Sequence, residues 1–210
     1  MNLPTKITFS RIIIIILMII GLSVAGVLTS NNVIDIPNLG NTGISLIYFI
    51  VFIIFLIASF TDFLDGYLAR KNNQVTSLGK FLDPVADKLL INSMIIFLCV
   101  PNTIASGQII ISVWCAIIFV ARDIVVDALR FIAAQKNIVI AANIFGKLKT
   151  VFQMVAISFV LLNGWPFSYF DATWLTGLHI TDFIVYAATI VSFLSGVIYI
   201  IQNRKVFLQK

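Results

Sequence analysis

The sequence contains no glutamate, one histidine and only two cysteines in 210 residues. Charged residues make up 11% of the chain, whereas apolar residues make up 60%. Cys99 and Cys115 lie in apolar stretches with no second cysteine or histidine at metal-ligand spacing, which favours buried thiols over a disulfide or a zinc site. The mean hydropathy of +1.06 argues against a soluble domain and predicts a membrane protein with several spans.

Basic residues are missing from three of the loops between the apolar stretches: 30–43, 101–108 and 163–181. All fourteen Lys and Arg residues fall within four segments: 1–11, 70–88, 122–149 and 204–210. With six transmembrane helices these four segments lie on one side, which the positive-inside rule makes cytoplasmic. The sequence therefore predicts an all-α polytopic membrane protein with six transmembrane helices, one domain over 1–210, and both termini in the cytoplasm. The formal charge of +5 is explained by topology and anion binding, without nucleic acid.

The expected spans follow the apolar stretches, at about 12–28, 44–60, 83–100, 109–120, 147–162 and 184–201. Residues 1–11 are expected to form a short segment at the membrane surface before the first span. The helix of the second span is expected to continue to about Arg70. Pro84 suits the first turn of the third helix, where its missing N–H costs nothing.

The stretch from Asp62 to Asp87, DFLDGYLARKNNQVTSLGKFLDPVAD, holds four of the nine aspartates. It fits the pattern D-x2-D-G-x2-A-R-x8-G-x3-D-x3-D. The pattern residues are Asp62, Asp65, Gly66, Ala69, Arg70, Gly79, Asp83 and Asp87. In a helix the first four share one face, and the last three, spaced four apart, form a stripe on a second helix. Two such helices would bring four carboxylates around one small volume.

Carboxylates crowded in this way repel each other unless a cation lies between them. Hard oxygen ligands select Mg²⁺, Mn²⁺ or Ca²⁺ over zinc, and four aspartates suffice for two divalent ions that assist phosphoryl displacement. Gly66 and Ala69 leave bare backbone for close ligand approach, and Arg70 can bind a phosphate. The alternative, capping and surface aspartates on ordinary loops, fits poorly with the flanking apolar spans, where ionisable groups are costly.

All eight pattern positions resemble the signature of the CDP-alcohol phosphotransferase family, integral membrane enzymes that transfer a phosphatidyl or phospho-alcohol unit from a CDP-linked donor to an alcohol. The resemblance implies a site for two Mg²⁺ or Mn²⁺ ions formed by Asp62, Asp65, Asp83 and Asp87, with Asp87 as the base. It further implies a donor-binding set of Asp65, Gly66, Ala69, Arg70 and Gly79. Members are commonly homodimers, so a homodimer is expected.

The N-terminal residues Asn2, Pro4, Thr8 and Arg11 resemble the N-x-P-x3-T-x2-R pattern that precedes the first span in bacterial members of this family. Beside the aspartate motif, this pattern suggests that Thr8 and Arg11 reach toward donor or acceptor phosphates, and we place them with the acceptor phosphate. The alternative for Arg11 is an anchor that obeys the positive-inside rule.

A second basic cluster consists of Arg122, Arg130, Lys147 and Lys149. Together with the N-terminus of the fifth helix these residues could bind a phosphate dianion. The segments R-[DE]-x6-R and G-K-x-K-T resemble those of phosphatidylglycerophosphate synthases, the family members whose acceptor is glycerol 3-phosphate. The alternative is simple positive-inside anchoring.

The resemblance predicts transfer of the phosphatidyl group from CDP-diacylglycerol to sn-glycerol 3-phosphate, giving phosphatidylglycerophosphate and CMP, among the lipids of a bacterial cell membrane. One alternative is another CDP-diacylglycerol transferase with a different acceptor, such as a cardiolipin or phosphatidylinositol-phosphate synthase. A second is a cation or proton transporter with intramembrane carboxylates. Transporters place such groups near the midplane and often contain repeats, whereas these carboxylates cluster at one membrane edge and no repeat is visible.

Overall fold

The computed structural model describes residues 2–40, 42–71, 76–100, 104, 110–136, 138, 144–171 and 179–204. Within these ranges some side chains are outside the description: those of Leu3, Pro4, Phe63, Asp65, Tyr67, Leu68, Ala69, Arg70, Ser77, Lys80 and Asp171.

The described residues form seven α-helices and no β-strand, which confirms the predicted all-α class. The helices are α1 Leu3–Ser30, α2 Leu46–Lys71, α3 Ser77–Cys99, α4 Val113–Gln135, α5 Ile144–Leu161, α6 Ser168–Asp171 and α7 Ile180–Gln202. Long apolar stretches become helices because lipid offers no hydrogen-bond partners for the backbone N–H and C=O groups, and a helix pairs these groups within itself. Polar side chains mark two of the helix starts. Thr76 Oγ1 accepts from Gly79 N at 3.0 Å, and Asp182 Oδ2 accepts from His179 N at 2.9 Å.

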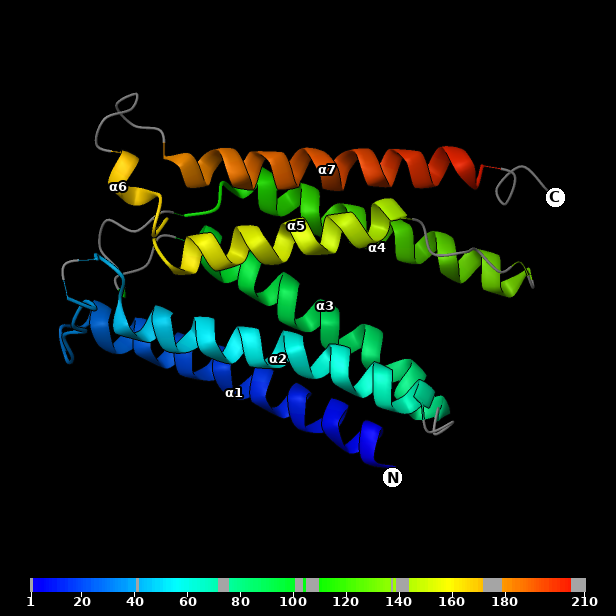
Figure 1. Ribbon diagram of the computed structural model, residues 1–210, viewed down its shortest axis with the longest axis horizontal. Helices are drawn as coiled ribbons and strands as arrows, with labels where there is room; N and C mark the ends of the chain where they lie inside the picture. Colours follow the sequence, from blue (N-terminus) through cyan, green and yellow to red (C-terminus); the bar gives the residue numbers. More distant parts are fainter. Residues whose placement is uncertain are drawn as a thin grey trace.

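The long helices lie lengthwise in an elongated bundle (Figure 1). α1 packs along α2 and α3, whereas α7 packs along α4 and α5, and α3 joins the two groups by contacting α4 and α5. The core between them is apolar, with Phe55, Leu90, Phe119 and Ile157 each at most 2% exposed. The start of α1 and the end of α7 lie at the same end of the bundle (Figure 1). This end carries the candidate site.

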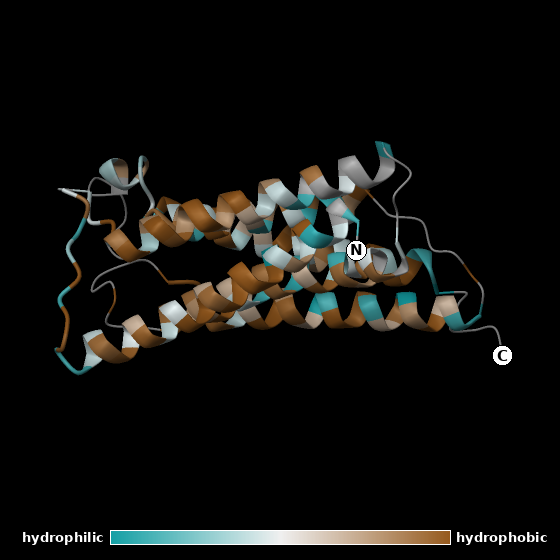
Figure 2. Cartoon of the chain, turned by 90° about the horizontal axis from the view of Figure 1, so that it is seen from below, coloured by the Kyte–Doolittle hydropathy of each residue, from teal (hydrophilic) through white to brown (hydrophobic). Residues whose placement is uncertain are grey.

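Apolar residues predominate along the long helices (Figure 2), and many of the large apolar side chains are exposed. In the part of the chain that the structure describes, three helical segments are long and apolar enough to cross a membrane, Thr5–Ser30, Ile144–Leu161 and Ile180–Gln202, and α2 has a shorter apolar run over Leu46–Asp62. Charged residues within α3 and α4 lower the hydropathy of these two helices. The membrane character is therefore supported, and the six-span topology stays a prediction.

Two helix starts differ from the expectation. Residues 3–11 are the first turns of α1 and not a separate surface segment, because α1 is one helix of 28 residues, about 42 Å long. α3 begins at Ser77, because Thr76 caps it there, so Pro84 lies inside the helix and not in its first turn. Pro84 lacks the N–H that would bond to the carbonyl of residue 80, and one helix hydrogen bond is lost.

Candidate active site

Two aspartates of the motif are bound by side chains from the start of α1. Thr8 Oγ1 donates a hydrogen bond to Asp83 Oδ1 at 2.9 Å, and Arg11 Nη1 donates to Asp62 Oδ1. Thr8 is 1% exposed and Arg11 is 2% exposed, so both contacts are made from inside the bundle. The sequence prediction places Thr8 and Arg11 at the acceptor phosphate. In the structure both side chains contact carboxylates of the motif, and their binding of the acceptor phosphate stays a prediction.

Gly79 has a packing role in the structure. Thr76 Oγ1, which caps α3, also lies 2.9 Å from Thr5 Oγ1. A Cβ added to Gly79 would lie 3.1 Å from Thr76 Oγ1, closer than a normal van der Waals contact. Glycine at this position therefore leaves room for the Thr76 cap of α3, whereas the same Cβ would lie at an ordinary contact distance of 3.6 Å from Thr5 Oγ1 of α1. Donor binding by Gly79 stays a prediction.

The remaining members of the motif are described unevenly. The side chains of Asp65, Ala69 and Arg70 lie outside the described residues, and Gly66 is half-buried in α2. Asp87 is half-buried in α3, within electrostatic range of Asp62, which repels it. Within the described ranges, no three His, Cys or Asp side chains are grouped closely enough to hold a metal ion. The two-metal site stays a prediction.

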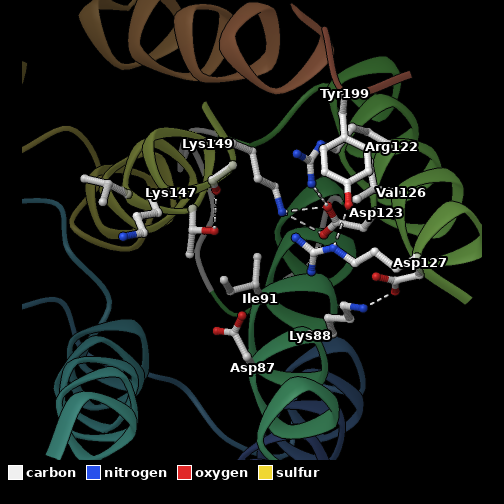
Figure 3. Close-up of a pocket in the computed structure, with 14 residues that line it drawn as sticks. Asp87, Lys88, Ile91, Arg122, Asp123, Val126, Asp127, Lys147, Lys149 and Tyr199 are labelled. Atoms are coloured by element: carbon white, nitrogen blue, oxygen red, sulfur yellow. Dashed lines mark hydrogen bonds and ion pairs between the residues drawn. The ribbon is translucent and has the colours of Figure 1, made fainter. Parts of the chain in front are cut away.

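A cavity of about 400 Å³ is lined by residues of α3, α4, α5 and α7 (Figure 3). All four residues of the predicted second basic cluster line it: Arg122, Arg130, Lys147 and Lys149. Asp87 lines the same cavity from α3. This volume suits a small polar ligand. The structure thus brings the last aspartate of the motif and the basic cluster to one place, although they are far apart in the sequence.

The two lysines of this cluster differ in their surroundings. Lys149 is 5% exposed, and its Nζ donates to Asp123 Oδ1 at 2.7 Å and to Oδ2 at 2.8 Å. Lys147 is exposed, and its ammonium points away from Asp123 (Figure 3). Residues two apart in a helix point in nearly opposite directions, which explains the difference. Lys149 is therefore part of the buried structure, whereas Lys147 is open to solvent.

Asp123 is the buried counter-charge of the cluster. Besides Lys149, it accepts a hydrogen bond from Arg122 Nη1 at 3.2 Å and is only 6% exposed. Burying a lone charge at this depth would cost several kcal/mol of folding free energy. The Asp123 carboxylate and the two cations therefore offset one another's cost of burial. At the cavity rim Lys88 forms an ion pair with Asp127, and both are more than a third exposed. Such an exposed pair contributes little stability.

α7 lines the cavity with Tyr199 and contacts two of the cavity arginines through residues that were not singled out in the sequence. Arg122 Nη2 donates to Ser195 Oγ at 2.6 Å, and Arg130 Nε donates to Tyr199 OH at 3.1 Å. The Arg130 guanidinium also lies 5.6 Å from the centre of the Tyr199 ring. The sequence contained a pointer to these residues, because Ser195 and Tyr199 are four residues apart on one face of a mainly apolar helix.

Residues 1–194 match the CDP-alcohol phosphatidyltransferase family, and the chain therefore belongs to that family. It is 37% identical to the CDP-diacylglycerol–glycerol-3-phosphate 3-phosphatidyltransferase of Bacillus subtilis over 205 residues, which covers 96% of this chain and 95% of that protein. A protein of the same name from Rickettsia bellii is 34% identical over 151 residues, covering 71% of this chain and 76% of the other.

A more partial match is the cardiolipin synthase (CMP-forming) of Oryza sativa, which is 39% identical over 111 residues. That match covers 49% of this chain and 33% of the rice protein, far less than the match to the Bacillus subtilis protein. The comparisons therefore favour the glycerol-3-phosphate enzymes over the cardiolipin synthase.

Proposed function

We propose that this protein transfers the phosphatidyl group of CDP-diacylglycerol to sn-glycerol 3-phosphate, giving phosphatidylglycerophosphate and CMP. Relatives named for this activity match the chain over most of its length. The structural observation that carries the proposal is the position of Asp87, which belongs to the aspartate motif and lines the cavity of the basic cluster. A reacting hydroxyl in this cavity would lie between the aspartate motif, which is expected to bind the donor, and the basic cluster, which is expected to bind the phosphate of the acceptor.

The charge of the cavity supports a phosphorylated acceptor. Its lining contains five basic residues and three aspartates, a net charge of +2 when all are ionised: Lys88, Arg122, Arg130, Lys147 and Lys149 against Asp87, Asp123 and Asp127. A phosphate dianion would balance this charge. The first turn of α5 also directs backbone N–H groups and the positive end of the helix dipole toward this region. An uncharged acceptor would leave this excess of positive charge unbalanced.

In the proposed reaction, Asp87 accepts the proton of the acceptor hydroxyl. The hydroxyl oxygen forms a bond to the phosphorus that carries diacylglycerol, and the bond from that phosphorus to the CMP oxygen breaks. CMP leaves with the electron pair of that bond. The basic cluster holds the acceptor by its phosphate at one end of the cavity, so that the hydroxyl is presented to Asp87.

We also propose that Asp62, Asp65, Asp83 and Asp87 bind two divalent ions, Mg²⁺ or Mn²⁺. A donor set made only of carboxylates supports these ions over zinc. When bound, the ions would stabilise the negative charge that develops on the leaving phosphate. The contacts of Thr8 with Asp83 and of Arg11 with Asp62 would hold two of these carboxylates in place.

The placement in the cell is part of the proposal. We propose six spans, a cytoplasmic site and cytoplasmic termini, supported by the fourteen basic residues in four segments that this topology puts on one side. A cytoplasmic site would give the water-soluble acceptor direct access, while the diacylglycerol tails of the donor stay in the membrane. The homodimer is proposed from the family resemblance alone.

The test is CMP release from CDP-diacylglycerol by the purified protein with a panel of acceptors: glycerol 3-phosphate, glycerol, inositol phosphate and phosphatidylglycerol. Release only with glycerol 3-phosphate is expected. Asp87→Asn should lower kcat by about 10²-fold or more, because general-base catalysis contributes about 10²–10⁴-fold. The matched control is Asp127→Asn, which changes a cavity carboxylate outside the motif and should cost no more than about fivefold. Turnover with phosphatidylglycerol and none with glycerol 3-phosphate would contradict the proposed acceptor.

A further inference from the structure

Arg122 reaches from α4 to α7 and lies flat against it. Its Nη2 donates to Ser195 Oγ at 2.6 Å. A Cβ added to the next residue, Gly196, would lie 2.9 Å from Arg122 Cγ, a distance that real Cβ atoms do not tolerate. Because Cγ is near the root of the side chain, the whole arginine would have to move. Glycine at 196 therefore makes the space through which Arg122 reaches Ser195.

This seating leaves two of the guanidinium N–H groups for a ligand. Arginine has five N–H donors. Asp123 accepts one from Nη1 and Ser195 accepts one from Nη2, and the Nε–H is buried beside Gly196, which leaves one N–H on each of Nη1 and Nη2. A Cβ on Gly146, in the first turn of α5, would lie 3.9 Å from Nη2. Arg122 is thus held on two sides with its remaining donors near the start of α5.

Arg130 is bound to α7 one turn further on. Its Nε donates to the OH of Tyr199 at 3.1 Å, and its guanidinium lies 5.6 Å from the Tyr199 ring centre, within cation–π range. Tyr199 is 3% exposed and packs with Val126 and Leu129 of α4, so its ring is a fixed support. Arg130 itself is exposed, and without this contact its long side chain would be free to move in solvent.

We propose that α7 helps the acceptor site to select its substrate. Ser195 and Gly196 position Arg122, and Tyr199 positions Arg130, so that both arginines bind the phosphate of the acceptor. This inference rests on the proposed function. The three α7 residues lie beyond residue 194, where the family match ends, and outside every motif found in the sequence. They act on the substrate through the arginines and are positioning residues.

The test measures KM and kcat for both substrates with the full-length protein in lipid–detergent micelles. Ser195→Ala and Tyr199→Phe should each raise the KM for glycerol 3-phosphate about five- to tenfold, the effect of losing one hydrogen bond. Gly196→Ala should raise this KM by a similar factor, because the added Cβ would displace Arg122 from Ser195. The KM for CDP-diacylglycerol should stay unchanged. Ser192→Ala is the matched control for Ser195, because Ser192 is buried on the same helix and its Oγ has no hydrogen-bond partner among the described residues. Gly21→Ala controls for Gly196, since a Cβ there would contact nothing within 4 Å.

A double-mutant cycle separates positioning from general damage to the fold. Ser195→Ala should add less than about twofold when Arg122 is already alanine, and Tyr199→Phe should add as little when Arg130 is alanine. Ser195→Ala removes only one oxygen, so the cycle stands even if Gly196→Ala fails to fold. Wild-type turnover with an unchanged KM for glycerol 3-phosphate in Ser195→Ala and Tyr199→Phe would overturn this inference alone, as would equal effects in the presence and absence of the arginines. A wild-type protein that releases no CMP with glycerol 3-phosphate would overturn the proposed function first.

Discussion

The buried ion pair between Lys149 and Asp123 should control stability, whereas the neighbouring Lys147 should not. Lys149→Met leaves Asp123 with only the 3.2 Å contact from Arg122, and Asp123→Asn leaves the Lys149 ammonium buried without its counter-charge. Breaking a buried pair on one side costs about 3–5 kcal/mol. For a chain of this length that is a fall in Tm of about 6–20 °C.

The double variant Lys149→Met/Asp123→Asn removes both charges, and it should be more stable than the sum of the two single effects predicts by about 2 kcal/mol or more. Lys147→Met is the matched control, since it removes an exposed lysine two residues away and should change stability by about 0.5 kcal/mol or less. Unfolding would be followed by circular dichroism in mixed micelles with increasing denaturing detergent. Additive single effects, or a Lys147→Met as unstable as Lys149→Met, would refute the reasoning.

Three further predictions concern the metal ions, the topology and the acceptor. Turnover should stop in excess chelator and return with Mg²⁺ or Mn²⁺, and undiminished turnover would rule out the two-metal site. In a variant without Cys99 and Cys115, cysteines at positions 35 and 171 should be labelled from outside intact cells, and labelling of position 74 would refute the topology. Lys147→Ala and Arg122→Ala should raise the KM for glycerol 3-phosphate about ten- to hundredfold with little change for CDP-diacylglycerol, because each removes a charge-assisted contact. A wild-type KM in both variants would mean that the basic cluster does not bind the acceptor, and the alternative of positive-inside anchoring would then hold.

The sequence by itself determined the helical membrane class, the family and the motif that marks the candidate site. Long apolar stretches must be helical in lipid, and a run of carboxylates at their edge has few structural uses. The extension of α2 through the motif was predicted to reach about Arg70, because the four small and acidic positions follow the helical period, and α2 ends at Lys71. These features depend on local sequence, and local sequence was sufficient to find them.

Only the tertiary structure decided which charges meet. The pairing of Asp123 with Lys149 joins α4 to α5. Lys147 and Lys149 could not be told apart from the sequence, and only the folded α5 shows that their side chains point in different directions (Figure 3). Thr8 and Arg11 bind the motif carboxylates, because α1 lies along α2 and α3. Ser195, Gly196 and Tyr199 contact Arg122 and Arg130 only because α4 packs against α7. Such contacts depend on the direction of each side chain and on the neighbours chosen by packing, and neither follows from spacing along the chain.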